Sequence, residues 1–190
     1  MFEVIQERLK KALDEPRFKH TIGVMYTAGC MAMAHGYDIS KAMLAGLLHD
    51  CAKCMTHEER IALCEKYEVE ITSSELENKA LLHAKAGAIL ARIEYDITDV
   101  DILHAITVHT TGEPDMNVLD KLIYIADYIE PGRDKAPNLE HVRSLAYQDL
   151  DACMAQILFD SLNYLNSRGG LIDPTTAEAN EFYKGYRKEY

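Results

Sequence analysis

Two aspartates of the chain lie in apolar surroundings, where an ionised carboxylate needs a partner. Asp50 follows His49 at the end of the apolar run 42–48, and Asp127 interrupts the apolar stretch 122–129. Burying an unpaired carboxylate costs free energy unless a cation compensates it. A metal ion held at both positions is the simplest compensation. The chemistry expected of such a centre is hydrolysis by a metal-activated water.

Histidines supply the remaining ligand candidates. His20 lies in an apolar helix, His49 adjoins Asp50, His83 opens a helix and His109 closes one. Imidazoles and carboxylates together suit iron, manganese, cobalt or zinc better than calcium, which prefers oxygen ligands. A single histidine is more often a satisfied core or surface residue, so the interpretation depends on the whole set. Adjacent side chains on a helix point about 100° apart, so several helices must contribute ligands to one ion.

The other four histidines do not fit this arrangement. His104 comes nearest, five residues before His109, but about 500° of helical rotation turns the two side chains roughly 140° apart. One ion cannot easily bind both. The remaining three lie at turn, surface or polar positions: His35, His57 and His141.

Three cationic side chains near these residues can bind a phosphorylated ligand. Arg17 and Lys53 each lie one helical turn from a candidate histidine, and Arg133 follows the helix that carries Asp127. Arginine can contact phosphate oxygens in bidentate fashion. Most Lys and Arg residues are solvated surface charges. The segment EPGR at 130–133 favours function for Arg133, because it fixes a helix exit beside a candidate ligand.

Helices must position these residues, because nearly every segment has helical period and none alternates as a strand does. The expected fold is all-α, with one domain over residues 1–190 and no boundary at the proline breaks near 137. Pro16 suits the first turn of the second helix, and Asp38 or Ser40 suits the cap of the third. The expected helices span about 3–13, 16–35, 38–50, 56–67, 74–78, 83–93, 99–109, 116–129 and 139–166, with a last helix after Pro174.

Composition limits the classes of function. A chain of 190 residues with 48% hydrophobic and 27% charged residues suits one globular core. The formal charge of −11 has the wrong sign for broad binding of DNA or RNA. No segment approaches the ~20 apolar residues of a membrane-spanning helix, so a soluble, cytoplasmic protein is expected.

The five cysteines predict neither a disulfide framework nor a zinc site. Their number is odd and no signal peptide precedes them. Cys51 and Cys54 form one C-x-x-C pair, but no second pair completes a zinc site. We therefore expect small, buried or half-buried helix residues.

The order of the candidate residues resembles the HD superfamily of metal-dependent phosphohydrolases. Three longer sequence motifs extend the resemblance to its YqeK-type branch: LLHDCAK at 47–53, HTTG at 109–112 and LDKLIYIADYIEPGR at 119–133. The resemblance covers about residues 17–133 and implies an HD-type helical bundle. It also implies symmetrical hydrolysis of diadenosine tetraphosphate, and of related dinucleoside oligophosphates, to two ADP by attack of a metal-activated water on phosphorus.

The resemblance further implies roles for individual residues. It assigns one metal ion, with iron favoured and manganese or cobalt as alternatives, to His20, His49, Asp50 and Asp127. His83 and His109 then face the phosphates or complete a second metal site bridged by Asp50. The implied catalytic residues are Asp50, His83, His109 and Lys53. The implied substrate contacts are Arg17, His20, His83, His109, Thr110, Asp127, Arg133 and Gly170, the last in a Gly-Gly stretch whose backbone can approach a nucleotide.

Other functions stay open at this point. Another HD-type phosphohydrolase would act on mononucleotides, and a nucleotide-binding sensor would keep the pocket without turnover. In the plainest alternative the same residues hold a structural ion. The expected partners are the dinucleotide, ADP and a second copy of the chain in a homodimer, with no extended nucleic acid and no membrane. The eleven tyrosines do not single out a platform for adenine.

Overall fold

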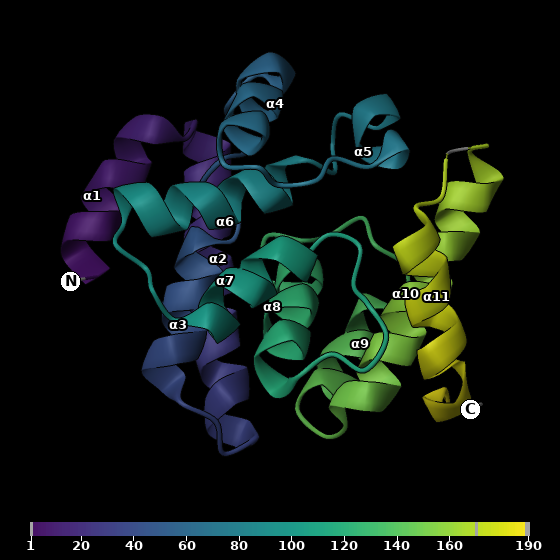
Figure 1. Ribbon diagram of the computed structural model, residues 1–190. Helices are drawn as coiled ribbons and strands as arrows, with labels where there is room; N and C mark the ends of the chain where they lie inside the picture. Colours follow the sequence, from purple (N-terminus) through teal and green to yellow (C-terminus); the bar gives the residue numbers. More distant parts are fainter. Residues whose placement is uncertain (1, 170, 189–190) are drawn as a thin grey trace.

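A computed structural model describes residues 2–169 and 171–188 of the protein, and every regular element in these ranges is a helix (Figure 1). The all-α fold expected from the helical period is confirmed. The helices are α1 (Phe2–Ala12), α2 (Glu15–Ala34), α3 (Ile39–Leu48), α4 (His57–Lys66), α5 (Ser73–Glu77), α6 (His83–Glu94), α7 (Val100–Val108), α8 (Val118–Ile129), α9 (Leu139–Ala146), α10 (Leu150–Ser167), α11 (Pro174–Tyr183) and the short 3-10 helix η1 (Lys184–Tyr186).

Polar caps start the helices near the positions that the sequence indicates. Asp14 accepts a hydrogen bond from the backbone N–H of Arg17 at the start of α2, and Pro16 lies in the first turn. Asp38 caps α3 in the same way. Gly36, with φ of +66°, permits the turn between the two helices. These caps determine which residues of α2 and α3 reach the middle of the molecule.

The single long helix expected over 139–166 is wrong, because the chain breaks into α9 and α10. Asp149 ends the break by accepting a hydrogen bond from the backbone N–H of Ala152, which caps α10. The turn lets α9 and α10 pack against each other instead of running on as one rod. No glycine or proline lies in 139–166, so the sequence carries no strong breaker there.

Four helices form the middle of the bundle. α2 packs along α3 and α8, while α7 packs against α3, α6 and α8 (Figure 1). Each contributes a large, fully buried side chain: Met25 from α2, Leu47 from α3, Ile106 from α7 and Ile123 from α8. This packing brings the last residues of α3 and α7 together between α2 and α8.

The main hydrophobic core extends over most of the described chain, from Ile5 on α1 to Tyr183 on α11. Tyr183 is fully buried, and its hydroxyl accepts a hydrogen bond of 2.9 Å from the backbone N–H of Met116. This contact ties α11 to the loop that leads into α8. The core thus continues across residue 137, where the sequence has its proline breaks.

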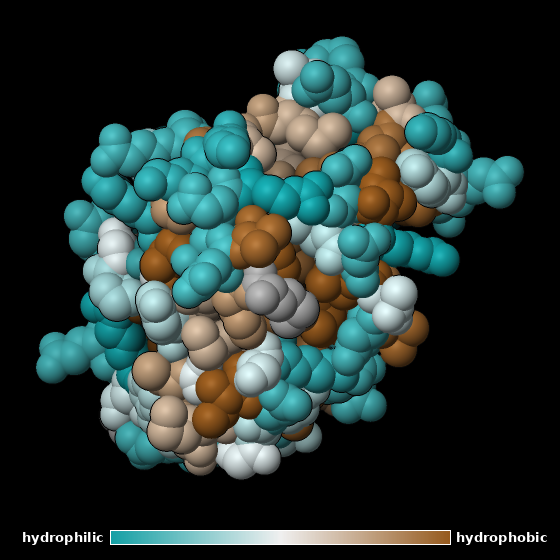
Figure 2. Space-filling model, turned by 90° about the vertical axis from the view of Figure 1, so that its left-hand side faces the viewer, coloured by the Kyte–Doolittle hydropathy of each residue, from teal (hydrophilic) through white to brown (hydrophobic). Residues whose placement is uncertain are grey.

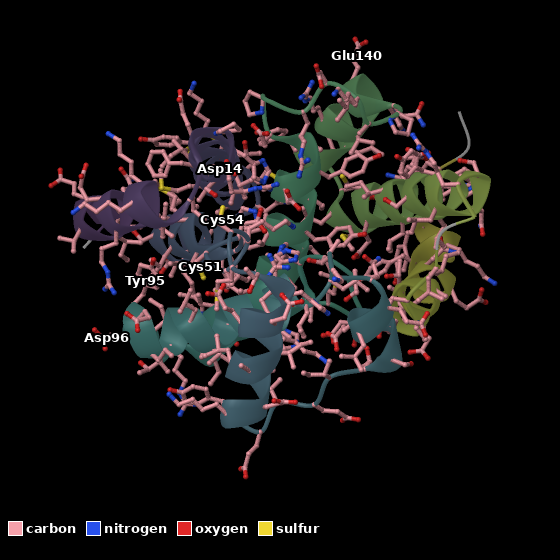
Figure 3. The ribbon with its side chains drawn as sticks, turned by 90° about the horizontal axis from the view of Figure 1, so that it is seen from above. Asp14, Cys51, Cys54, Tyr95, Asp96 and Glu140 are labelled. Carbon is pink, nitrogen blue, oxygen red and sulfur yellow. The ribbon has the colours of Figure 1, made fainter. Side chains whose placement is uncertain are left out.

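The two cysteines of the C-x-x-C pair lie in turns after α3, and only one of them is buried. Cys51 lies against α6, where its thiol donates to the carbonyl of Gly87, whereas Cys54 is exposed and faces Asp14 (Figure 3). The expectation of helix residues is therefore wrong for both, because α3 ends at Leu48. The expectation of burial is wrong for Cys54, and for Cys30 on α2, which is also exposed. All five cysteines are free thiols.

On the side of the molecule that carries α1, hydrophilic side chains cover much of the surface and apolar groups show between them (Figure 2). Among the described residues, no helix combines the length and apolar character that crossing a bilayer requires.

Candidate metal centre

Three imidazoles are oriented by backbone carbonyls close to them in the chain. Each donates its Nδ1–H to the carbonyl three residues earlier: His49 to Gly46 at 2.7 Å, His83 to Ala80 at 2.6 Å and His109 to Ile106 at 2.6 Å. A carbonyl can only accept, so Nδ1 must carry the proton. In the neutral ring Nε2 then keeps a free lone pair, as a metal ligand requires.

A fourth imidazole, that of His20 on α2, is oriented by a carboxylate. Its Nδ1 lies 3.1 Å from Oε1 of Glu130, which is buried. The other oxygen of Glu130 accepts a hydrogen bond of 2.6 Å from the backbone N–H of Gly132. A Cβ atom at Gly23 would lie 2.5 Å from Oε2, and one at Gly132 would lie 2.8 Å from Oε1. Glycine at both positions therefore leaves the space that this carboxylate occupies.

Asp50 lies between two pairs of these imidazoles and turns one oxygen toward each pair. Its Oδ2 is 3.5 Å from Nε2 of His49 and 3.8 Å from Nε2 of His20. Its Oδ1 is 3.0 Å from Nε2 of His83 and 3.6 Å from Nε2 of His109. A single carboxylate thus joins the two halves of the centre.

Asp127 on α8 completes the first half. Its Oδ1 lies 3.0 Å from Nε2 of His20 and 3.9 Å from Nε2 of His49. The structure therefore brings together the four residues to which the resemblance assigns a metal ion. The second half consists of Asp50, His83 and His109, whose ligand atoms lie within 4.8 Å of one another.

The hydrogen-bonding state of the centre fits a bound cation. Nε2 of His20, Nε2 of His49 and Oδ1 of Asp50 are buried without a hydrogen-bond partner. Nε2 of His83 and Nε2 of His109 lie 3.1 Å apart, although both rings already donate through Nδ1. Lys53 Nζ donates to Nε2 of His83 at 2.9 Å and the Thr110 hydroxyl lies 3.2 Å from Nε2 of His109, so both lone pairs attract a donor or a cation. The donors, imidazole nitrogen and carboxylate oxygen, suit a divalent transition metal.

The ionisation of the centre also suits metal binding. Burial raises the pKa of Asp50, but the neighbouring imidazoles, His49 first among them, outweigh this and hold the pKa well below 3.8. For Asp127, burial is likewise outweighed by His20, His49 and Arg133 beside it, and the pKa is lowered. Burial lowers the pKa of His83 to about 4. Both carboxylates are therefore charged and His83 is neutral at pH 7.

The three cations singled out in the sequence all reach the centre. Arg17 Nη1 donates to Asp50 Oδ2 at 2.6 Å, and Arg133 Nη2 donates to Asp127 Oδ1 at 2.5 Å. Lys53 Nζ lies 3.5 Å from Asp50 Oδ1. Burial lowers the pKa of Lys53, although Asp50 opposes the shift.

Two candidates and one excluded histidine remain to be considered. Thr110 lies at the centre, with its hydroxyl 3.2 Å from Nε2 of His109. Gly170 lies outside the described residues. His104, which the sequence analysis excluded from the site, contacts a separate pair of acidic residues. Its Nε2 lies 3.1 Å from Oε1 of Glu113, and its Nδ1 lies 3.1 Å from Oδ1 of Asp120.

Sequence reasoning missed two residues that hold the centre together. It considered Glu130 only as part of a helix exit, and it did not consider Arg143. The guanidinium of Arg143 on α9 donates to three carbonyls of the turn after α8: those of Ile129 at 3.0 Å, Glu130 at 3.1 Å and Arg133 at 2.9 Å. Both contacts join distant parts of the chain, so no local pattern indicates them.

Two cavities flank the centre, one on each side of the turn at 130–133. One, the cation cavity, has a volume of about 480 Å³ and is lined by Lys53, His109, Asp127, Arg133 and Lys135 among others. The other, the tyrosine cavity, has a volume of about 650 Å³ and is lined by His20, Tyr26, Glu130 and Tyr147 among others. Gly132 lines both. Their volumes are in the range of small-molecule sites, about 300–1,000 Å³.

Comparisons with known families, proteins and solved structures agree with the geometry of this centre. A family model described as "HD domain" matches residues 17–132. Two proteins named "Bis(5'-nucleosyl)-tetraphosphatase, symmetrical", from Halalkalibacterium halodurans and Bacillus subtilis, are each 39% identical over 170 residues, covering 88% of this chain and 89% of the relative. A crystal structure from Clostridium acetobutylicum, described as a predicted HD superfamily hydrolase involved in NAD metabolism, superposes with a TM-score of 0.94 at 38% identity and covers 98% of both chains.

Proposed function

Because the chain belongs to the HD domain family, we propose that it is a symmetrical bis(5'-nucleosyl)-tetraphosphatase that hydrolyses diadenosine tetraphosphate to two ADP. The resemblance drawn from the motif words is confirmed by the family match. The observation that carries the proposal is the centre itself: Asp50 turns one oxygen to each of two imidazole pairs, and three cations stand beside it. Relatives that bear this name match almost the whole chain.

The reaction breaks the central anhydride of the tetraphosphate. Water adds its oxygen to one of the two middle phosphorus atoms, and the bridging oxygen leaves with the other, so that each half becomes ADP. A bound divalent metal supplies Lewis acidity and lowers the pKa of water. His20, His49, Asp50 and Asp127 would hold it.

The chain's own residues supply the remaining functions. Arg17, Lys53 and Arg133 bind and orient the phosphates, with arginine offering two parallel donors to one phosphate. Asp50 and Asp127 are ionised, so either can accept the proton that water loses. Thr110 adds a neutral hydroxyl beside His109.

The two halves of the centre support two metal ions over one. His83 is neutral at pH 7 in this environment, so it is a poor proton donor and a suitable ligand. We propose that His83 and His109 hold a second ion with Asp50, in preference to binding phosphate directly. The proximity of the two Nε2 atoms supports this assignment.

Finer points of the proposal come from the family resemblance, for the metal and Gly170, and from length and composition, for the single domain and the location. We propose iron as the native metal, residues 1–190 as one functional domain, the cytoplasm as the location and a homodimer as the assembly. We also keep Gly170 as a substrate contact. Elemental analysis of the protein as isolated tests the metal, cell fractionation tests the location, and sedimentation velocity tests the assembly.

Product analysis tests the function. Metal-loaded protein incubated with diadenosine tetraphosphate should yield ADP alone, as separated by ion-exchange chromatography. AMP together with ATP would contradict symmetrical cleavage. Hydrolysis of mononucleotides with the dinucleotide left intact would identify another HD-type phosphohydrolase, and binding of ADP without any turnover would identify a sensor.

A further inference from the structure

A symmetrical substrate needs space for a nucleoside on each side of the centre. If the central anhydride lies at the metal ligands, the two ADP halves extend in opposite directions from it. This consideration rests on the proposed function. The turn at 130–133 separates two cavities that differ in chemistry, which permits such an arrangement.

The cation cavity suits phosphate. Lys53, Arg133 and Lys135 line it, together with the centre residues His109 and Asp127 and with Asp134. Two tyrosines line it as well, but Tyr124 is buried and Tyr128 is only half-buried. The tyrosine cavity differs, since its one lining cation is Lys19, which pairs with Glu15 at 2.6 Å. Its carboxylate, Glu130, already binds His20 and Gly132. An uncharged group therefore fits this cavity better than phosphate does.

The tyrosine cavity adjoins the centre at His20 and is lined by two tyrosine side chains. His20 is the one proposed metal ligand in its lining, and Tyr26 lies six residues further along the same helix. With a rise of about 1.5 Å per residue, Tyr26 lies ~9 Å along α2 from His20. Tyr147, at the end of α9, lines the cavity as well. A group bound beside these rings lies apart from the reacting phosphates, as the base of a nucleotide does.

Both tyrosine rings are available to a ligand. Tyr26 is 56% exposed and Tyr147 is 44% exposed, and neither stacks on another aromatic ring within the described ranges. Nucleobases stack on exposed aromatic side chains whatever their sequence, because every base has a π-face.

We propose that the tyrosine cavity binds one nucleoside of the dinucleotide, with its base against Tyr26 and Tyr147. The first phosphate of this half then points past Gly132, which lines both cavities, toward the metal ligands. The second half extends over the cation cavity. The two tyrosines thus act in substrate binding and take no part in the bond cleavage.

Kinetics with diadenosine tetraphosphate test the assignment. The variants Tyr26→Ala and Tyr147→Ala, and their combination, remove the rings at the cavity. Contacts made equally in ground state and transition state affect KM alone. We expect each single variant to raise KM about tenfold at unchanged kcat, which corresponds to about 1.4 kcal/mol of binding. Tyr26→Phe and Tyr147→Phe keep the ring and should restore KM to the wild-type value.

A matched control and a direct probe complete the test. Tyr67→Ala removes an equally exposed ring that lines neither cavity, and it should leave KM unchanged. Photolysis of wild-type protein with an 8-azidoadenine analogue of the substrate should label the peptides that contain Tyr26 or Tyr147. This measurement needs no variant to fold.

The outcomes separate the two proposals. Normal formation of ADP with wild-type KM in the double variant, or photolabelling confined to other peptides, overturns the nucleoside site and leaves the proposed function standing. A wild-type protein that fails to convert diadenosine tetraphosphate to ADP overturns the proposed function, and the nucleoside site with it.

Discussion

His20 and Glu130 lie 3.1 Å apart, Nδ1 to Oε1, and this contact sets His20 apart from the other imidazoles of the centre. The other three each donate to the carbonyl three residues earlier in the chain. Glu130 instead comes from the end of α8. The contact therefore couples a ligand on α2 to the turn at 130–133, and the carboxylate makes the imidazole a stronger electron-pair donor.

We expect Glu130→Ala to weaken metal binding about 10- to 100-fold, the effect typical of removing a group that orients a metal-binding imidazole. Competition with a chromogenic chelator measures the affinity. Glu130→Gln keeps one oxygen acceptor for His20 and should lose less. Glu7→Ala removes an exposed glutamate on α1 and serves as the matched control. Equal affinities of wild type and Glu130→Ala would mean that His20 needs no support from this carboxylate.

Asp50→Asn should release both metal ions, because Asp50 offers one oxygen to each half of the centre. Activity should fall at least about 100-fold, since even the partners of metal ligands contribute up to that factor. Elemental analysis and the rate of ADP formation check both effects. Circular dichroism should keep its helical signal, and unfolding of the variant would instead favour a structural ion.

His83→Ala should release one ion and leave the other, since His83 lies in the half formed with Asp50 and His109. The metal content per chain is again the measurement. A variant that keeps as much metal as the wild type would assign His83 to the phosphates, which is the other role that the resemblance allows.

Arg143→Ala should lower the free energy of unfolding by about 3 kcal/mol, because hydrogen bonds from charged groups contribute roughly 1.5–3 kcal/mol each and their effects are not additive. Urea denaturation followed by circular dichroism measures the change. Arg92→Ala, at an exposed position in the last turn of α6, should have little effect. Similar stabilities of Arg143→Ala and Arg92→Ala would mean that the hydrogen bonds of Arg143 do not hold the turn at 130–133 in place.

His104 gives stability a defined pH dependence. Burial lowers its pKa, but the contact with Asp120, aided by the charges of Glu113 and Asp101, outweighs burial and raises the pKa above 6.5. For Asp120, burial outweighs the contact with His104 and raises the pKa of this carboxyl. Glu113 and Asp101 also lie near His104, and their charges favour its protonated form. The stabilisation that a raised imidazole pKa gives to the folded state is complete below pH 6.5. It disappears as the pH rises through the pKa that His104 has in the folded state.

The difference in unfolding free energy between wild type and His104→Gln should therefore be larger at pH 6 than at pH 9. Because 43% of the side chain is exposed, solvent screening limits the gain to about 1 kcal/mol or less. Thermal or urea unfolding at the two pH values provides the comparison. A difference in unfolding free energy that grows with pH would contradict the raised pKa of His104.

The sequence allowed prediction of what short-range patterns encode. Helical period indicated an all-α fold, and carboxylates in apolar stretches, together with the family motifs, indicated the set that now lies around Asp50. The contacts of Glu130 and Arg143 could not be predicted, because they depend on how α8, α2 and α9 pack. The break at Asp149 escaped for a different reason: a side-chain cap ends and restarts the helix there without a glycine or proline.

The placement of His49 and His109 has an electrostatic consequence of its own. They follow the last residues of α3 and α7, so the carboxyl ends of two helices converge on the centre. Aligned peptide dipoles leave a partial negative charge at such ends, and the rings bind carbonyls of the last turns. The backbone thus attracts cations but repels phosphate, which explains why an anionic substrate needs Arg17, Lys53 and Arg133 at its rim.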